Sequence, residues 1–261
     1  MKKIGFIGLG NMAGAILKGA LKSGFLNEDD VVAYDIDESK YSNFNEYHLI
    51  KAKNEKELVE NSEIIFVGVK PQVVEKVILP LKEVLQDKAI ISIVLGYDFN
   101  KYNQLLDEST RHIFVMPNTP ALVNEGMSLI EESHSLLKNE FEFVVSLFSS
   151  IGEVEILPSH LMSVGGALSG CGPAYIYMVI EGLADGAVKK GMPRALAYRL
   201  ASQTVLGAGK MQMETSLHPG ILKDNVCSPG GTTIKGVSIL EKKGLRSAMI
   251  EAVEQGLAPK K

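Results

Sequence analysis

IGFIGLGNMAG, residues Ile4–Gly14, is the stretch that decides the fold of this chain. A short β-rich run is followed by a glycine turn and a helix start, in the pattern G-x-G-x-x-A at Gly8, Gly10 and Ala13. Gly8 permits a tight turn, Gly10 lets the backbone approach a pyrophosphate, and Ala13 allows close packing of helix on sheet. The pattern predicts a dinucleotide site, and the alternative is a glycine turn in a sheet that has lost its ligand.

An acidic residue follows the second β-rich run. Val31–Tyr34 leads into Asp35, where a carboxylate can accept hydrogen bonds from the adenosine ribose. A 2′-phosphate would meet Asp35 and Asp37 with only Lys40 nearby, so repulsion favours NADH, with NADPH as the other possibility. The alternative is a solvated turn carboxylate. The cofactor contacts expected in this first segment are Gly8, Gly10, Asn11, Met12 and Asp35.

Short β-rich runs alternate with helical stretches up to Leu157, which predicts βαβ units on a mainly parallel sheet. The expected strands are Lys3–Ile7, Val31–Tyr34, Ile64–Val69, Ala89–Ile93, Ile113–Met116, Met127–Ile130 and Glu153–Ile156. After Leu157 only helical periodicity remains, with glycine and proline interruptions, one of them at Gly170–Pro173. We expect an α/β protein: a Rossmann-like dinucleotide-binding domain over residues 1–157 and an all-helical dimerisation domain over residues 158–261.

Local helix signals refine this picture. Asn54 followed by Glu57 predicts a capped helix, Pro71 suits a first helical position, and Pro80 should kink or split a helix over Val73–Leu85. In the second half, two long helices are apolar around much of their circumference and rich in Gly and Ala, namely Tyr175–Lys190 and Arg194–Thr215. Such helices cannot all be covered within one thin domain, so we expect a second copy of the chain to bury them.

Composition excludes several classes of protein. The net charge of -4 offers no basic field for nucleic acid or anionic lipid. The longest apolar runs, such as Ile64–Val69 and Ala89–Leu95, are strand-sized and well short of the ~20 residues of a membrane span. A strand pattern begins at Lys3, which leaves no room for a signal peptide, so a cytoplasmic location is expected. Two cysteines support neither a disulfide framework nor a structural metal site.

Four later motifs resemble the pyrroline-5-carboxylate reductases in order and spacing. They are Val69–Pro71, Met116–Ala121, Ala167–Tyr175 and above all Leu222–Thr233, which contains Ser-Pro-Gly-Gly-Thr-Thr. The resemblance runs from the first strand to Gly256. It implies an enzyme that uses NAD(P)H to reduce the ring C=N bond of 1-pyrroline-5-carboxylate to L-proline, the final step of proline biosynthesis. It also implies a homodimer, or a ring of dimers, built through the helical domain.

The Ser-Pro-Gly-Gly-Thr-Thr block has a physical interpretation of its own. Pro229–Gly231 precedes a helical run from Thr232, and the free N–H groups of a helix N-terminus can hold an anion such as the substrate carboxylate. In the family, the residue matching Thr233 bonds the ring nitrogen, which makes it the catalytic candidate. The alternative is an ordinary helix cap. The expected substrate contacts are Ser228, Gly230, Gly231, Thr232 and Thr233.

Further cofactor contacts follow from the resemblance alone. The matching positions, which line the cofactor cleft of the family, are Asn54, Val69, Lys70, Pro71, Ser92 and Asn118. Lys70 is equally interpretable as a solvated lysine, and Asn118 as a turn residue before Pro120. The five histidines form no constellation, so surface or capping roles are expected for each.

Two departures from the family pattern and two rival functions remain. Many members carry a small polar residue at Asp35, and some carry a glutamate where Ser216 and Leu217 precede His218. The first departure argues against the phosphorylated cofactor that the family often uses. One rival is a β-hydroxyacid dehydrogenase, with Lys189 or Lys190 as proton donor, or a different cyclic-imine reductase. The other is a catalytically silent cofactor-binding regulator.

Overall fold

The computed structural model describes residues 3–257, which form two compact units that divide between Gly170 and Cys171. The last strand of the first unit ends at Leu157, and the helical residues up to Gly170 belong to that same unit. The compact units thus divide 13 residues later than the expected boundary between residues 157 and 158. Whether cofactor binding and dimerisation divide at residue 157 stays a prediction.

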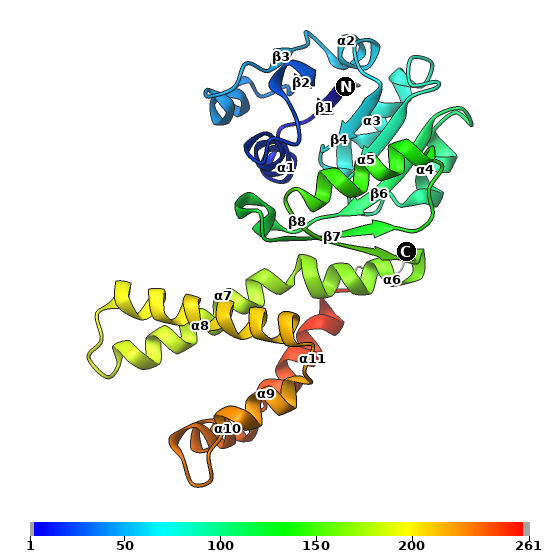
Figure 1. Ribbon diagram of the computed structural model, residues 1–261. Coiled ribbons are helices and arrows are strands. Elements are labelled where there is room, and N and C mark those ends of the chain that lie inside the picture. Colours follow the sequence, from blue (N-terminus) through cyan, green and yellow to red (C-terminus); the bar gives the residue numbers. More distant parts are fainter. Residues whose placement is uncertain (1–2, 258–261) are drawn as a thin grey trace. The chain divides into compact units, whose positions relative to one another are not determined.

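The first unit is built around one mixed sheet (Figure 1). Its strands are β1 Ile4–Ile7, β2 Val31–Tyr34, β3 Ile50–Lys51, β4 Ile64–Val67, β5 Ala89–Ser92, β6 Arg111–Met116, β7 Gly126–Glu131 and β8 Gly152–Leu157. Among the described residues they join in the order β3-β2-β1-β4-β5-β6-β7-β8 as eight strands. Every neighbouring pair is parallel except β6 and β7. The fold class is confirmed; β3 was not predicted because two residues are too few to show a period.

Helices cover both sides of this sheet (Figure 1). They are α1 Asn11–Lys22, η1 Glu28–Asp30, η2 Glu38–Phe44, α2 Glu55–Glu60, η3 Pro71–Val73, α3 Val74–Ile78, η4 Leu79–Leu81, α4 Phe99–Leu105, η5 Thr119–Val123, α5 Lys138–Ser149, α6 Ser159–Gly165 and the π-helix η6 Gly166–Gly170. The local signals are confirmed: the Asn54 side chain accepts a hydrogen bond from the Glu57 N–H at 2.9 Å, Pro71 opens η3, and the helix around Pro80 splits into α3 and η4.

Two apolar layers hold the sheet between the helices. On one side, residues of α1 and α5 pack on the strands, and the rings of Phe6 and Phe66 stack at 4.6 Å. On the other side, α2, α3 and α4 cover the alternate strand residues, among them Ile65 and Val67. Burying one such side chain contributes about 2 kcal/mol. Because both faces are covered, β1 and β4 read as continuous apolar runs rather than as alternating ones.

The second unit is helical throughout its described part. Its helices are α7 Gly172–Val188, α8 Arg194–Thr215, α9 Pro219–Val226, α10 Thr232–Lys242 and α11 Leu245–Gln255. The bounds predicted for α8 are confirmed, as is the helix start at Thr232. Ala184, Ala197 and Ala201 form the small buried cluster where α7 meets α8, while many larger apolar side chains of this unit stay exposed.

The interruption expected at Gly170–Pro173 is wrong. The chain passes through the π-helix η6 and directly into α7, with Pro173 in the first turn, where a missing N–H costs nothing. The resulting helical run, Ser159–Val188, spans 30 residues. It is long and apolar enough to cross a membrane, and only 11% of its most apolar stretch is buried within the protein. The strand-sized runs noted in the sequence did not reveal it, because glycines and serines interrupt its apolar residues.

Candidate active site

The candidate cofactor residues gather at one edge of the sheet. Since β3, β2, β1, β4, β5 and β6 are parallel, their carboxyl ends meet there, and strand order runs outward from β1 in both directions. Ligands of open α/β sheets bind at such a switch point. The residues at this edge, each at or just after a strand end, are Gly8, Asp35, Asn54, Val69, Lys70, Pro71, Ser92 and Asn118.

The glycine turn is shaped for an anion. Gly8 has φ of +92°, and a Cβ there would lie 3.0 Å from the carbonyl oxygen of Gly68 and 3.2 Å from Cγ1 of Val69. Gly10 precedes α1, no side chain caps that helix, and the space beside the Gly10 Cα is open. The first N–H groups of α1, at Asn11 and Met12, are thus offered to a ligand with the positive end of the helix dipole. These residues fit a dinucleotide pyrophosphate.

Asp35 connects two turns at this edge. Its Oδ2 accepts a hydrogen bond from the Leu9 N–H at 2.6 Å, and its Oδ1 accepts one from the Asp37 N–H at 2.8 Å. The carboxylate therefore holds the glycine turn against the end of β2. A carboxylate has about four acceptor positions, so these bonds leave capacity for ribose hydroxyls. No local pattern indicates this structural role of Asp35, because its partner Leu9 lies 26 residues away along the chain.

Three other candidates have side chains that the protein itself engages. Asn54 caps α2, as described above. The Ser92 hydroxyl is fully buried, accepts hydrogen bonds from the Tyr102 hydroxyl at 2.8 Å and the Val94 N–H at 3.2 Å, and so faces the interior. Burial raises the pKa of Tyr102 far above its ordinary value. Asn118 is also buried and uses both ends of its amide. Any contact of Ser92 or Asn118 with a cofactor would therefore involve backbone atoms.

Lys70 differs from these in being exposed and uncommitted. It precedes η3 as the N-cap, and within residues 3–257 its ammonium group forms no ion pair. Val69, its neighbour, is half-buried beside Gly8. The structure thus brings the ends of β1 and β4 together and leaves one cation there that can approach a phosphate.

The candidate substrate residues lie in the second unit, between α9 and α10. Gly230 has φ of +70°, which favours glycine, and a Cβ at Gly231 would lie 2.4 Å from the Ser228 hydroxyl, which would have to rotate away. The Gly231 N–H donates to the Ser228 carbonyl at 3.0 Å, which closes the turn. Gly231 is the N-cap of α10, and no side chain caps this helix. The exposed hydroxyls of Thr232 and Thr233 are therefore not used as caps.

Histidine placement corrects one expectation. His112 is buried, its ring stacks on Phe99 at 4.8 Å, and burial lowers its pKa, so it is a core residue rather than a surface or capping one. His218 does cap: its Nδ1 accepts a hydrogen bond from the Gly220 N–H at 3.0 Å. Within the described part of the chain, no group of three or more His, Cys, Asp or Glu side chains is placed to hold a metal ion.

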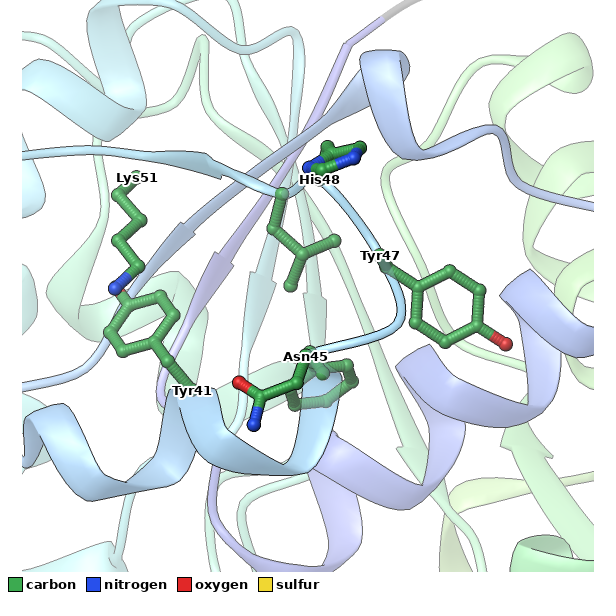
Figure 2. A pocket seen from close by; sticks show the side chains of 7 residues that line it. Tyr41, Asn45, Tyr47, His48 and Lys51 are labelled. Atoms are coloured by element: carbon green, nitrogen blue, oxygen red, sulfur yellow. The ribbon is translucent and has the colours of Figure 1, made fainter.

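A hollow of about 280 Å³ lies between η2 and the segment that leads from it into β3 (Figure 2). Its lining comes from Tyr41, Phe44, Asn45, Tyr47, His48, Leu49 and Lys51. None of the candidate cofactor or substrate residues contributes to it. The Lys51 ammonium lies 4.0 Å from the centre of the Tyr41 ring, so a cation–π contact within the protein already occupies the lysine.

Comparison with known proteins shows which families the chain resembles along its length. A family model described as pyrroline-5-carboxylate reductase dimerisation matches residues 159–260, and one described as NADP oxidoreductase coenzyme F420-dependent matches residues 3–96. The pyrroline-5-carboxylate reductase of Escherichia coli (strain K12) is 41% identical over 254 residues, covering 97% of this chain and 94% of the relative. That of Pisum sativum is 41% identical over 251 residues, covering 96% of this chain and 92% of the relative.

Solved structures agree with these matches. The structure of Plasmodium falciparum pyrroline carboxylate reductase with NADP bound superimposes with a TM-score of 0.89 at 32% identity, covering 98% of this chain and 95% of that one. A pyrroline-5-carboxylate reductase from Coxiella burnetii gives 0.88 at 29% identity, covering 98% and 96%. With similarity of this kind along its whole length, the chain belongs to the pyrroline-5-carboxylate reductase family.

Proposed function

We propose that this chain reduces the C=N bond of 1-pyrroline-5-carboxylate with a nicotinamide dinucleotide to give L-proline, the final step of proline biosynthesis. The observation that carries the proposal is the uncapped start of α10 in the Ser-Pro-Gly-Gly-Thr-Thr turn, within a chain similar to these reductases along its whole length. Residues 1–157 would bind the cofactor, and residues 158–261 would dimerise and hold substrate; the dimerisation family match begins at residue 159. Turnover of 1-pyrroline-5-carboxylate by the purified chain tests the proposal.

The substrate carboxylate would bind at the N-terminus of α10. The N–H groups of Thr232 and Thr233 have no partner within the helix, and they lie at its positive end. Ser228 can add a hydroxyl, and glycine at positions 230 and 231 lets the backbone approach the ligand. Each hydrogen bond to a charged group contributes about 1.5–3 kcal/mol, so a few such donors suffice to orient a small anion in a protein of net negative charge.

Thr233 would hold the ring nitrogen. Its hydroxyl can donate to the imine nitrogen or accept from the protonated iminium, and either bond fixes the C=N bond relative to the carboxylate bound at the same helix start. A nicotinamide held at the glycine turn would supply the hydride for the ring carbon, and a proton from solution would complete the amine. The protein's part is to orient the ring and to polarise the bond that is reduced.

We infer that NADH is preferred over NADPH. Asp35 follows β2, where folds of this kind contact the adenosine ribose, and Asp35 and Asp37 would repel a 2′-phosphate with no arginine in this turn to offset them. Asp35→Ser is expected to shift the ratio of kcat/KM values toward NADPH by about tenfold, since it removes one of these two charges. It should also weaken binding of both cofactors, because the Leu9 N–H loses its acceptor. Steady-state kinetics with both cofactors provides the measurement.

Asp29→Asn is the matched control for cofactor choice. It removes the same charge from η1, which precedes the amino end of β2 and so lies at the opposite edge of the sheet. The ratio should stay unchanged in this variant. A wild-type protein with higher kcat/KM for NADPH, or an Asp35→Ser variant with the wild-type ratio, would contradict the inference.

We propose a cytoplasmic homodimer, in which a second subunit would cover the exposed apolar surface of the second unit. Met178 of α7, Leu206 of α8 and Ile239 of α10 are 70%, 55% and 58% exposed, more than a stable monomer of this size is expected to leave in water. A second subunit would also cover the apolar run Ser159–Val188.

Sedimentation equilibrium at micromolar concentration is therefore expected to give twice the mass of one chain, with no monomer that keeps activity. Fractionation of cells should leave the protein in the supernatant without detergent. A folded, active monomer would contradict the dimer, and recovery only with detergent would favour a membrane-bound helix.

A further inference from the structure

The π-helix η6 is pressed tightly onto the sheet. A Cβ at Gly166 would lie 2.1 Å from Sδ of Met116 in β6, and a Cβ at Gly165 would lie 2.6 Å from Cδ1 of Leu129 in β7. A Cβ at either position would have to displace the side chain of Met116 or Leu129, so glycine permits this close approach. A π turn contains an extra residue relative to an α turn, is rare, and occurs often at functional sites. The extra residue also rotates every later side chain of the helix about its axis.

Side chains stabilise this wide turn. Nδ2 of Asn118 donates to the carbonyl of Ser169 at 3.0 Å, and the hydroxyl of Ser169 donates to the carbonyl of Gly165 at 3.0 Å. Oδ1 of Asn118 accepts from the Met127 N–H at 2.9 Å. The buried amide thus joins the end of β6 and the start of β7 to the π turn, which lies 51 residues further along the chain.

This junction lies at the edge of the sheet where the candidate cofactor residues gather. Asn118 follows the carboxyl end of β6, at the same edge as Gly8 and Lys70, so the Ser169 carbonyl bonded to it lies at that edge as well. The space beside the Gly170 Cα is open. The backbone at Ser169–Gly170 is therefore available to border the cofactor, while the amide of Asn118 is directed at protein atoms.

We propose that Asn118 is a positioning residue, which holds the π turn and so fixes the backbone at Ser169–Gly170 beside the cofactor, instead of contacting the cofactor itself. This inference rests on the proposed function. Asn118→Asp is the sharpest test, because the carboxylate still accepts from the Met127 N–H but no longer donates to the Ser169 carbonyl. Asn118→Ala removes both hydrogen bonds and replaces the Asp variant as the test if that variant does not fold.

Two measurements need no substrate. Hydrogen exchange of the cofactor-free protein should show amides within residues 166–174 exchanging at least about tenfold faster in Asn118→Asp, with the strands of the sheet unchanged. Titration with NADH should give a Kd within about twofold of wild type, since no cofactor contact is lost. Ser169→Ala, which removes the bond to Gly165 and keeps the Asn118 bond, is the matched control and should show a smaller increase in exchange.

Kinetics then separates positioning from simpler roles. In Asn118→Asp, kcat with 1-pyrroline-5-carboxylate should fall about tenfold, and the isotope effect with deuterated NADH should rise, because a displaced site slows hydride transfer. A Kd for NADH raised tenfold with wild-type kcat would overturn the proposal in favour of direct contact. A lower Tm with wild-type kcat and isotope effect would overturn it in favour of a purely structural role. If wild-type protein does not reduce 1-pyrroline-5-carboxylate, the proposed function fails. Hydrogen exchange then decides whether Asn118 holds the π turn, and the Kd for NADH decides whether Asn118 contacts the cofactor.

Discussion

Replacing Thr233 by Val is expected to lower kcat/KM for 1-pyrroline-5-carboxylate by roughly a hundredfold. The substitution keeps the shape of the side chain and removes only the hydroxyl that we propose orients the ring nitrogen. Loss of one well-placed polar contact to a group whose charge changes in the transition state costs on the order of 2–4 kcal/mol. Thr233→Ser retains the hydroxyl and should keep much of the activity. Steady-state kinetics of the three proteins under one set of conditions is the measurement.

A helix-capping role for Thr233 would give a different result. Loss of a capping hydroxyl lowers the free energy of unfolding by about 1 kcal/mol and leaves catalysis by the folded molecule intact. Since no side chain caps α10, we expect the Val variant to melt close to the wild-type temperature. A Val variant with near-wild-type kcat/KM per folded molecule would remove Thr233 from the mechanism and leave the ring nitrogen to be oriented by other groups.

Replacing Arg111 by Met is expected to lower the free energy of unfolding by about 3 kcal/mol, because it breaks a largely buried ion pair. Nε and Nη2 of Arg111 donate to the two carboxylate oxygens of Glu140 at 2.8 and 2.9 Å, and Nη2 also donates to the Asp87 carbonyl at 2.8 Å. The side chain of Glu140 is only 3% exposed. Hydrogen bonding to Glu140 raises the pKa of Arg111, so the guanidinium stays charged throughout the neutral range.

Two controls identify the buried charge as the cause. The double variant Arg111→Met, Glu140→Leu should recover much of the lost stability, because the burial cost of both charges disappears with the pair. Arg111 opens β6 at the edge opposite the candidate site, so kcat of the folded single variant should match wild type. Urea unfolding supplies the free energies. A loss below about 0.5 kcal/mol would show that the pair behaves as an exposed one.

The parts of the fold that sequence predicts well are those with local causes. The glycine turn at Gly8 and the helix start at Thr232 depend on residues within a few positions of each other, and both are confirmed. The apolar runs of β1 and β4 are equally local, because burial on both faces leaves no polar alternation. A feature whose cause lies within a few neighbouring residues can therefore be predicted from the local sequence.

The parts that sequence does not predict depend on partners far along the chain. Gly170–Pro173 suggested a break, yet the helical run continues there, and just before it Gly165 and Gly166 pack closely on β7 and β6. The bond that holds this turn joins Asn118 to a carbonyl 51 residues away. His112 became a core residue because Phe99 of α4 packs on its ring. No periodicity or motif within one segment reports contacts of this kind.

The most direct test of the account is the consumption of NADH by the purified chain when 1-pyrroline-5-carboxylate is added. We expect one proline to appear for each NADH oxidised, with little oxidation when six-membered imines or oxidised β-hydroxyacids replace the substrate. A folded dimer that binds NADH yet forms no proline would contradict the account and identify a catalytically silent cofactor-binding protein.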